Sequence, residues 1–451
     1  MFRGFFRPEG GVAMLEGLSR LLWGWHVVIL ILGAGAWFTW ESGFFQIRAA
    51  GRWLGAALSC AGEGKKAGGL SRLQALATGL AGSLGTGNIV GVGVALAAGG
   101  PGALFWMALS ALLGMMTVFG ENVLAARHRG KPGPLGYLER AGGRPLAWVY
   151  ALGCCLSALV MGNMVQTGAA AAALSLFQVP PWGAGAVLGL LAFLGAWSGL
   201  GKGARALEKL VPLMTLLFFA GTLALLWRCR ARIPGAFLQI LQGAFSLEAG
   251  AGGAAGMLLA VQAGVTRGVF TNEAGLGSAS FAYGAVGDRS PGELGCLGIF
   301  QVFLDTLVMC TLTGLCVVCC APQGDPGQLV FLAFRQGLGP GGARLLGLCT
   351  ALFALATITA WSCYGKEALG YLTGGRGGRL YAAGAGACAF LGCVLPLSQI
   401  FLLGDAMNGL MALPNLFALF LLSREVREEV RALERPLPHS PGSLHNFLKK
   451  V

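Results

Sequence analysis

Residues 81–93 of the chain read AGSLGTGNIVGVG, a stretch in which five of thirteen residues are glycine. Each glycine weakens a helix by about 1 kcal/mol relative to alanine. We therefore expect the backbone to unwind at Gly85 to Gly87. Residues 267–280 read RGVFTNEAGLGSAS, and the same reasoning predicts unwinding from Gly275 to Gly277.

The sequence around these two stretches is strongly apolar. Apolar residues make up 55% of the chain and charged residues 11%, and the mean hydropathy is +0.69, whereas about a quarter of the residues of a soluble protein are charged. Runs of the length that spans a bilayer recur between Leu21 and Ser423. The sequence predicts an all-α polytopic membrane protein with a single membrane domain over residues 1–451. Within it we expect an N-terminal segment at 1–20, a transmembrane bundle at 21–423 and a tail at 424–451.

We predict about eleven crossings. The first apolar run, Leu21 to Trp40, is interpreted as a span and not as a cleavable signal, because it is long and many others follow it. The stretch from Gly341 to Tyr371 fits either one long span or one span plus an interfacial turn. The predicted spans begin at Leu21, Leu76, Leu104, Leu146, Gly183, Leu207, Ala255, Leu294, Leu345, Leu380 and Ile400.

The distribution of basic residues predicts the orientation, because cytoplasmic loops concentrate Lys and Arg near the membrane. The connections at residues 99–102 and 178–182 contain neither. We therefore expect a cell-membrane protein with its N-terminus outside and its tail cytoplasmic, although Arg228, Arg230 and Arg232 run against this pattern. Basic residues cluster after the first, third and fifth spans and in the tail: Arg48, Arg52, Lys65, Lys66, Arg72, Arg127, Arg129, Lys131, Arg140, Arg144, Lys202, Arg205, Lys209, Arg424, Arg427, Arg431, Lys449 and Lys450.

The charge distribution and the cysteine spacing argue against a nucleic-acid-binding protein, a disulfide-rich protein and a zinc protein. The formal net charge of +13 is spread over short connections and forms no continuous basic face, which argues against a nucleic-acid partner. The thirteen cysteines lack the regular spacing of a disulfide framework or a zinc site. Several, including Cys154, Cys155, Cys310 and Cys316, lie in apolar spans. We interpret the cysteines as small core residues.

The two broken spans indicate a binding site, because unwound backbone within a membrane is tolerated only where it is buried in protein or lines a polar cavity. Half-helix N-termini present amides to a carboxylate, and freed carbonyls can coordinate an amine or an alkali cation. One alternative is that the glycines only permit close helix packing. A nucleotide-binding glycine loop is another, but residues 85–91 lack the strand and the downstream acidic residue that such a loop requires.

Four motifs resemble the alanine or glycine:cation symporter family: Gly82 to Met107, Gly162 to Gln166, Arg267 to Ala279 and Asp405 to Leu419. The resemblance covers nearly the whole chain. It implies a leucine-transporter-like fold, two inverted repeats of five helices preceded here by one extra span. It further implies import of alanine or glycine, coupled to Na⁺ by alternating access, with H⁺ as the alternative ion. We expect no cofactor and a functional monomer.

Asn88 and Gln166 can both donate and accept hydrogen bonds, which suits a zwitterion that must be bound and released. Gln166 could instead make an interhelical hydrogen bond. The resemblance implies that amides around residues 85–87 hold the substrate carboxylate. Bulky walls would leave room for little beyond a methyl group, although aromatic residues in membrane helices often serve packing alone. The predicted substrate-binding residues are Gly85, Thr86, Gly87, Asn88, Gln166, Phe270, Thr271, Leu276, Thr357 and Trp361.

For the cation, Thr357 is the leading hydroxyl ligand, since a hard ion favours several oxygen ligands. The resemblance implies that carbonyls of Ala81, Leu84 and Ala354 complete this site. Thr271 and Ser83 are weaker candidates for a second cation.

Five ionisable residues lie inside apolar spans, where charge is costly and usually functional. Glu273 could neutralise Arg267, fix the unwound backbone or titrate during transport. Asp305 and Asp405 could be structural anchors. The five are Glu121, Glu273, Asp305, Glu367 and Asp405.

The chain departs from the family pattern at four positions, which leaves the substrate size limit and the coupling ion open: Ser280, Tyr283, Ser362 and Cys363. A membrane enzyme is a competing function, but Asp305 and Asp405 lack the flanking motifs of an aspartyl protease. A channel or an amino-acid receptor could use the same pocket.

Overall fold

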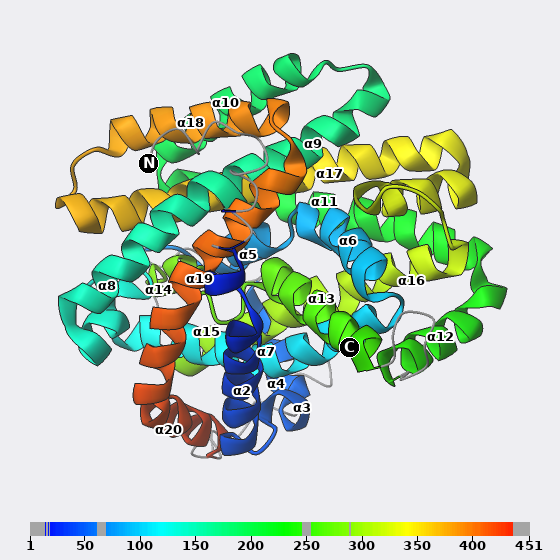
Figure 1. The fold of residues 1–451 in the computed structure, drawn as a ribbon. Coiled ribbons are helices and arrows are strands. Elements are labelled where there is room, and N and C mark those ends of the chain that lie inside the picture. The colour runs from blue at the N-terminus through cyan, green and yellow to red at the C-terminus, as the bar shows by residue number, and fades with distance from the viewer. Residues whose placement is uncertain are drawn as a thin grey trace, which may run out of the picture.

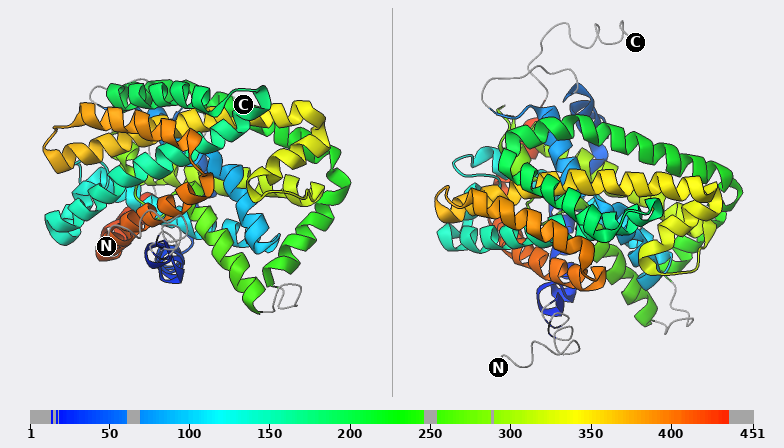
Figure 2. Two further views of the ribbon diagram at one scale, coloured as in Figure 1. Left: turned by 45° about the horizontal axis from the view of Figure 1, so that its top comes forward. Right: turned by 90° about the horizontal axis from the view of Figure 1, so that it is seen from above.

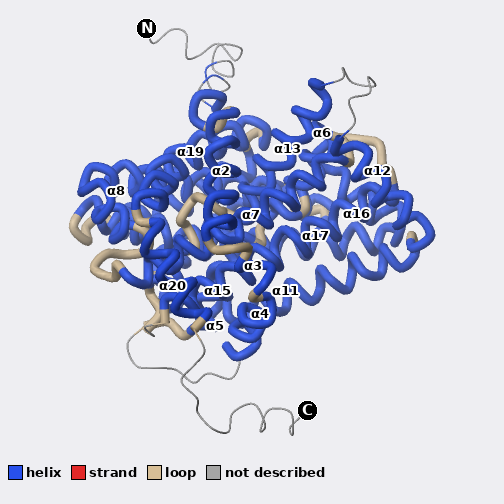
Figure 3. Tube along the Cα trace, turned by 90° about the horizontal axis from the view of Figure 1, so that it is seen from below, coloured by secondary structure: helices blue, strands red, loops and turns tan. Residues whose placement is uncertain are grey.

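The computed structural model describes residues 19–60, 69–245, 254–287 and 290–435, together with Met14 and Gly17. Nearly all of this part is helical, and within it only an isolated bridge joins Leu70 and Val286 in the manner of strands (Figure 3). Lys65, Lys66, residues 1–13 of the predicted N-terminal segment and residues 436–451 of the predicted tail lie outside the described residues.

Figure 1 shows the order of the helices. Those of the first half are α2 (Trp25–Glu41), α3 (Phe45–Arg48), α4 (Ala50–Ser59), α5 (Arg72–Ser83), η3 (Thr86–Asn88), α6 (Val90–Gly99), α7 (Gly102–Arg127), α8 (Leu135–Leu159), η4 (Val160–Val165), α9 (Gln166–Leu174), η5 (Ser175–Phe177), α10 (Pro181–Ser198), α11 (Leu200–Arg228), η6 (Arg230–Arg232) and α12 (Ile233–Phe245). Those of the second half are α13 (Ala254–Asn272), α14 (Ser280–Gly284), α15 (Pro291–Val302), η7 (Phe303–Cys310), α16 (Thr311–Cys320), η8 (Pro326–Gln328), α17 (Leu329–Thr373), α18 (Gly378–Val394), α19 (Leu397–Leu421) and α20 (Ser423–Glu434).

Within the described ranges, eight helices are long and apolar enough to cross a membrane. Three further predicted spans coincide with elements that fall short of that standard: the broken pairs α5–α6 and α13–α14, and the 17-residue α18. The count of eleven therefore stays a prediction. The alternatives left open for residues 341–371 are resolved in favour of one long helix, because α17 has non-helical backbone only at Gly339, where φ is +74°.

Both glycine-rich stretches interrupt their helices where the sequence predicts. α5 ends at Ser83, and the short 3₁₀ segment η3 separates it from α6. α13 ends at Asn272, and Gly275 and Gly277 then adopt positive φ angles of +90° and +69° before α14 begins. These conformations favour glycine because a Cβ would be strained there. Neither break lies at the surface, since residues 74–93 and 269–283 are buried throughout.

The bundle is held by close helix contacts. α7 packs against α13 and α15, α8 packs against α17 and α19, and α11 lies beside α17 (Figure 2, right, green and yellow). α10 and α18 form an adjacent pair (Figure 1, top). A Cβ at Gly189 would lie 2.8 Å from the carbonyl oxygen of Gly386, and one at Gly386 would lie 2.9 Å from that of Gly189. Small residues thus allow this pair to approach closely, as in other membrane bundles.

Among the described residues, two segments are π-helical: η4, in the middle of the α8–α9 span, and η7, between α15 and α16. π-Turns are rare and are frequent at functional sites. Gln166 follows η4 directly, and Asp305 lies within η7.

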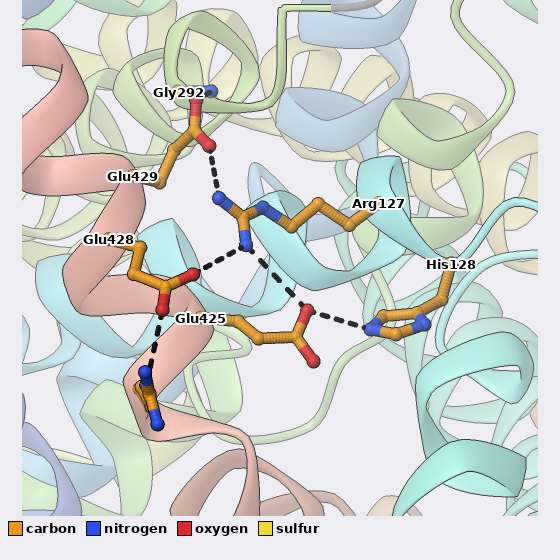
Figure 4. A network of polar contacts seen from close by, with 7 residues as sticks. Arg127, His128, Gly292, Glu425, Glu428 and Glu429 are labelled. Atoms are coloured by element: carbon orange, nitrogen blue, oxygen red, sulfur yellow. Dashed lines mark hydrogen bonds and ion pairs between the residues drawn. The ribbon is translucent and has the colours of Figure 1, made fainter.

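α20 begins one residue before the predicted tail and packs against α7 and α15 (Figure 4). Arg127, the last residue of α7, contacts three carboxylates of α20, at 2.8 Å from Glu429, 3.5 Å from Glu428 and 3.8 Å from Glu425. Glu429 also accepts a 3.0 Å hydrogen bond from the backbone N–H of Gly292. These contacts hold α20 on the end of the bundle that carries the basic loops.

Candidate functional site

The break after α5 frees backbone groups that a continuous helix would use. The N–H of Gly85 donates to the carbonyl of Ser83 at 2.7 Å and not to that of Ala81. The freed carbonyl of Ala81 instead accepts a 2.8 Å hydrogen bond from the hydroxyl of Thr357 on α17. The two residues predicted to share a cation site are therefore brought together.

The next freed group is the N–H of Thr86. It donates to Oε1 of Gln166 at 2.9 Å, and the Thr86 hydroxyl donates to the same oxygen at 2.9 Å. Gln166 Nε2 in turn donates to the carbonyl of Met161 within η4 at 3.3 Å. The side-chain oxygen of Gln166 thus accepts two hydrogen bonds from Thr86. The carboxylate of a ligand could accept the same two hydrogen bonds.

Gly85 lies between these two groups. A Cβ at this position would be 2.8 Å from both Gln166 Oε1 and Thr357 Oγ1. Only glycine leaves room for both contacts. Leu84 and Ala354, the other predicted cation ligands, are fully buried on α5's end and α17.

Asn88 faces a different partner. Its Nδ2 donates to Asp305 Oδ1 at 2.7 Å, and its Oδ1 is buried without a hydrogen-bond partner. Asp305 Oδ2 accepts from Thr306 at 2.6 Å, and the Thr306 hydroxyl lies 3.3 Å from that of Thr271. Two hydroxyls, one carboxylate and one unsatisfied amide oxygen therefore gather between the first break and η7. Such oxygens suit a cation or a proton.

The second break is held by α7 and α19. Glu121 Oε1 accepts from the N–H groups of Gly275 and Gly277 at 2.9 and 3.1 Å, and from Asn415 Nδ2 at 2.8 Å. Asn415 Nδ2 also donates to the carbonyl of Gly275 at 2.9 Å. Glu121 thus satisfies amides that the unwound backbone leaves without helical partners.

Glu273 lies at the end of α13 with a φ of +60°, uncommon for a residue other than glycine. Its carboxylate accepts a 2.7 Å hydrogen bond from Trp361 Nε1 and another from the Ser278 hydroxyl. Arg267 pairs instead with Asp405 at 2.6 Å. Of the three roles left open for Glu273, neutralisation of Arg267 is therefore wrong, and fixing the unwound backbone agrees with its contacts.

An aromatic and ionic cluster lies on one side of the breaks. Phe270 packs on Phe401 with ring centroids 5.5 Å apart, and the Arg267 guanidinium lies over both rings, 5.4 and 5.3 Å from their centroids. Arg267 and Asp405 also line a pocket of about 270 Å³, together with residues of α6 and α13. The ion pair therefore lies in the wall of this pocket, beside the two aromatic rings.

The remaining predicted residues can be placed in the same way. A Cβ on Gly87 would lie 2.8 Å from Thr271 Cγ2, so the first break adjoins the last turn of α13. The Leu276 carbonyl accepts from Tyr150 at 2.6 Å. The Ser83 hydroxyl donates to the carbonyl of Gly79 at 3.3 Å and accepts from Gln301 Nε2 at 3.5 Å. Glu367 is only partly buried.

Asp305 and Asp405 have separate partners, so these contacts do not unite them as an aspartyl dyad. Asn415, Ser278 and Tyr150 are site residues that the sequence reasoning missed. Asn415 alone carried a signal, as an amide beside Pro414 in an apolar span.

A sequence model of the sodium:alanine symporter family matches residues 10–440. The chain belongs to the sodium:alanine symporter family. It is 36% identical to the sodium/alanine symporter AgcS of Methanococcus maripaludis, over 93% of this chain and 97% of the relative. It is 31% identical to the probable sodium/glutamine symporter GlnT of Bacillus subtilis, over 90% of this chain and 87% of the relative.

This sodium:alanine symporter family member resembles the crystal structure of MhsT in complex with L-phenylalanine, with a TM-score of 0.60 and 16% identity, over 82% of this chain and 97% of that chain. At that identity the likeness shows the fold alone, and it confirms the predicted leucine-transporter-like fold. Family membership places the chain among sodium-coupled amino-acid symporters, which are multi-pass membrane proteins and not enzymes.

Proposed function

We propose that this chain imports a small neutral amino acid, alanine or glycine, together with Na⁺ by alternating access. The observation that carries the proposal is the pair of freed backbone groups at the first break. The Ala81 carbonyl meets the Thr357 hydroxyl, and the Thr86 amide meets an amide oxygen of Gln166. Ala81 and Thr357 offer oxygen ligands for a cation, and the Thr86 amide offers a position for an anion. Gly85 lies beside both pairs of groups.

In this proposal the cation lies among the oxygens of Ala81, Leu84, Ala354 and Thr357 and ties α5 to α17. The substrate carboxylate replaces Gln166 Oε1 at the Thr86 donors, and Gln166 then binds the substrate through its amide. Asn88, Thr271 and Asp305 form a second position for a cation or a proton. H⁺ remains the alternative coupling ion.

The substrate size limit is assigned to the buried walls formed by Phe270, Leu276 and Trp361. Trp361 is held at its indole N–H by Glu273, and a Cβ on Gly162 would lie 2.4 Å from the Trp361 Cβ. A wall fixed on both sides cannot move aside for a larger side chain. Because GlnT is named for glutamine, glutamine is the informative larger competitor.

Orientation and assembly complete the proposal. We place the end of the bundle that carries the basic loops and α20 in the cytoplasm. The N-terminus and the pocket lined by Arg267 and Asp405 then lie on the outer side of the membrane. We propose that the protein functions as a monomer.

The test is uptake of radiolabelled alanine, glycine and glutamine into proteoliposomes, with an inward Na⁺ gradient compared with K⁺ at equal pH. We expect Na⁺-dependent accumulation of alanine or glycine, its loss in Gln166→Ala, and little uptake of glutamine. The matched control is Gln239→Ala, because Gln239 is exposed on α12.

Three outcomes would contradict parts of this proposal. Uptake driven only by a pH gradient would show that the coupling ion is H⁺ and not Na⁺. Uptake of glutamine equal to that of alanine would remove the size limit. Binding of amino acids without accumulation of any of them would favour the receptor interpretation.

A further inference from the structure

Two cysteines from different repeats meet at one end of the bundle. Ten of the thirteen cysteines are buried, and only Cys229, Cys320 and Cys388 are partly exposed. The interpretation of cysteines as core residues is thus confirmed for the ten, and the other three are partly buried and pack against the edge of the core. The sulfur atoms of Cys229 and Cys320 lie 3.8 Å apart.

Both thiols are positioned by helix ends. Cys229 is the residue directly after α11, and Cys320 is the last residue of α16, followed by Ala321 with a φ of +48°. Arg232 ties the two ends together, since its Nη1 donates to the carbonyl of Cys319 at 3.2 Å. A disulfide needs a sulfur separation of about 2 Å. The two sulfur atoms, 3.8 Å apart, must therefore move closer together before a bond can form. This movement is accessible because helix ends are the parts of a helix that open most readily.

The thiols are also open to a reagent. A pocket of about 290 Å³ is lined by Cys229 and Cys320 together with Arg228, Arg232 and Gln336. Cys319, the neighbour of Cys320, is 4% exposed and is absent from the residues that line this pocket. The geometry therefore favours pairing of Cys229 with Cys320 over pairing with Cys319.

The pair lies on the side that the proposed orientation places outside the cell, because α11 begins beside Lys202 and ends at Arg228. Extracytoplasmic compartments are oxidising, and disulfides persist there.

We propose that Cys229 and Cys320 form a disulfide bond on the outer side of the membrane. The oxidant is a disulfide, either a small molecule or that of a thiol oxidoreductase. One cysteine thiolate attacks it to give a mixed disulfide, and the second displaces the carrier sulfur. The Cys229–Cys320 bond forms, the oxidant's disulfide breaks, and the two thiol hydrogens end on the two thiols of the reduced oxidant.

The bond joins the two repeats. Under the predicted arrangement α11 is the last span of the first repeat, and α16 belongs to the second span of the second repeat. In an alternating-access carrier one part of the bundle moves against the other, so the bond restrains the outer ends of these spans. This consequence rests on the proposed function, whereas bond formation does not.

The bond is tested on the purified full-length protein. It is treated with 4,4′-dithiodipyridine, its remaining thiols are blocked with N-ethylmaleimide, and it is digested and analysed by mass spectrometry without reductant. We expect a linked peptide pair containing Cys229 and Cys320, about 2 Da lighter than the two free peptides together. It should be absent from Cys229→Ser and Cys320→Ser and present in Cys388→Ser. Linkage of Cys229 to Cys319, or no linkage of Cys229, would overturn the proposal.

Uptake in proteoliposomes tests the consequence. We expect oxidised wild-type protein to lose uptake and recover it with dithiothreitol, while Cys229→Ser is insensitive to the oxidant. A linked pair with unchanged uptake would overturn the restraint. Absence of uptake in reduced and oxidised protein alike, with the linked peptide present, would refute the proposed function and leave the disulfide standing.

Discussion

Gly85 shows how closely a single residue can be constrained at the first break. Its missing side chain is what allows Gln166 on α9 and Thr357 on α17 to approach the same backbone position. Gly91, six residues further along, has no heavy atom within 4 Å of its hypothetical Cβ beyond its chain neighbours and its own helix backbone. Replacing each glycine by alanine therefore distinguishes two effects. At Gly85 the new methyl group crowds its neighbours, whereas at Gly91 it changes mainly the helix propensity.

Gly85→Ala is expected to lower the affinity for the amino acid, while Gly91→Ala leaves it unchanged. Overpacking of a well-filled site costs about 1–3 kcal/mol, which corresponds to about 5–150-fold in a binding constant. Radioligand binding to purified protein measures both variants. Equal affinities in the two variants would contradict the proposed role of Gly85.

The ion pair between Arg267 and Asp405 is expected to behave as a buried pair, since the side chains are 15% and 7% exposed. Asp405→Asn leaves the guanidinium without a counter-ion, and such a loss costs about 3–5 kcal/mol. The apparent melting temperature should fall in Asp405→Asn and recover in part in Arg267→Gln/Asp405→Asn. Additive losses in the double variant would show that the two charges are not coupled.

The sequence reveals some site residues and conceals others for a physical reason. Gly85 and Gln166 are detectable because glycine clusters and lone amides are unusual in apolar spans. The hydrogen bond of Asn415 joins α19 to Glu121 on α7, and Arg267 on α13 pairs with Asp405 on α19 and not with the nearby Glu273. Such contacts are set by three-dimensional packing and have no local pattern.

Among the elements, the two breaks were predictable because glycine acts locally on the helix that contains it. The π-helical segments η4 and η7 were not, since their sequences VMGNMV and FLDTLVMC also suit an α-helix. The kink at Gly339 was likewise missed, although Pro340 follows it.

α20 is an element whose attachment can be tested separately. Arg127→Ala removes the side chain that contacts three of its carboxylates. Exposed ion pairs contribute about 0.2–1 kcal/mol each, so the loss should be about 1–2 kcal/mol and should speed hydrogen exchange across Ser423–Glu434 by about 5–30-fold.

The control is Arg424→Ala, because Arg424 is 86% exposed and pairs only with Glu428 within α20 among the described ion pairs. It should leave exchange nearly unchanged. Equal acceleration in both variants would show that Arg127 does not anchor the helix.

On the scale of the whole molecule, composition and span length fix the class of fold, and family resemblance gives the arrangement of repeats. The number of crossings is harder to predict, because a criterion of continuous apolar length excludes the two broken spans and the 17-residue α18. The structure therefore has fewer regular apolar helices than predicted crossings.

A cation that joins α5 to α17 should stabilise the entire bundle, because a ligand bound only by the folded state adds about 2.7 kcal/mol at a hundredfold excess over its Kd. Na⁺ is expected to raise the apparent melting temperature and K⁺ is not. Thr357→Ser should keep the shift, since it keeps the hydroxyl, and Thr357→Ala should lose it. A shift that persists in Thr357→Ala would move the cation elsewhere.

The π-helical segment η4 has a further consequence, which concerns rotational phase. An α-helix turns by about 100° per residue, and a π-turn contains an additional residue. Because the wider turn absorbs that residue, the residues after η4 keep nearly the phase of a regular helix that is one residue shorter. If Val160–Val165 tightened to an α-helix with all its residues kept, Gln166 would swing by about 100° around the axis and separate from Thr86, with every proposed binding residue still present. The direction of this side chain therefore depends on the backbone geometry of the segment before it as well as on the identity of the residues.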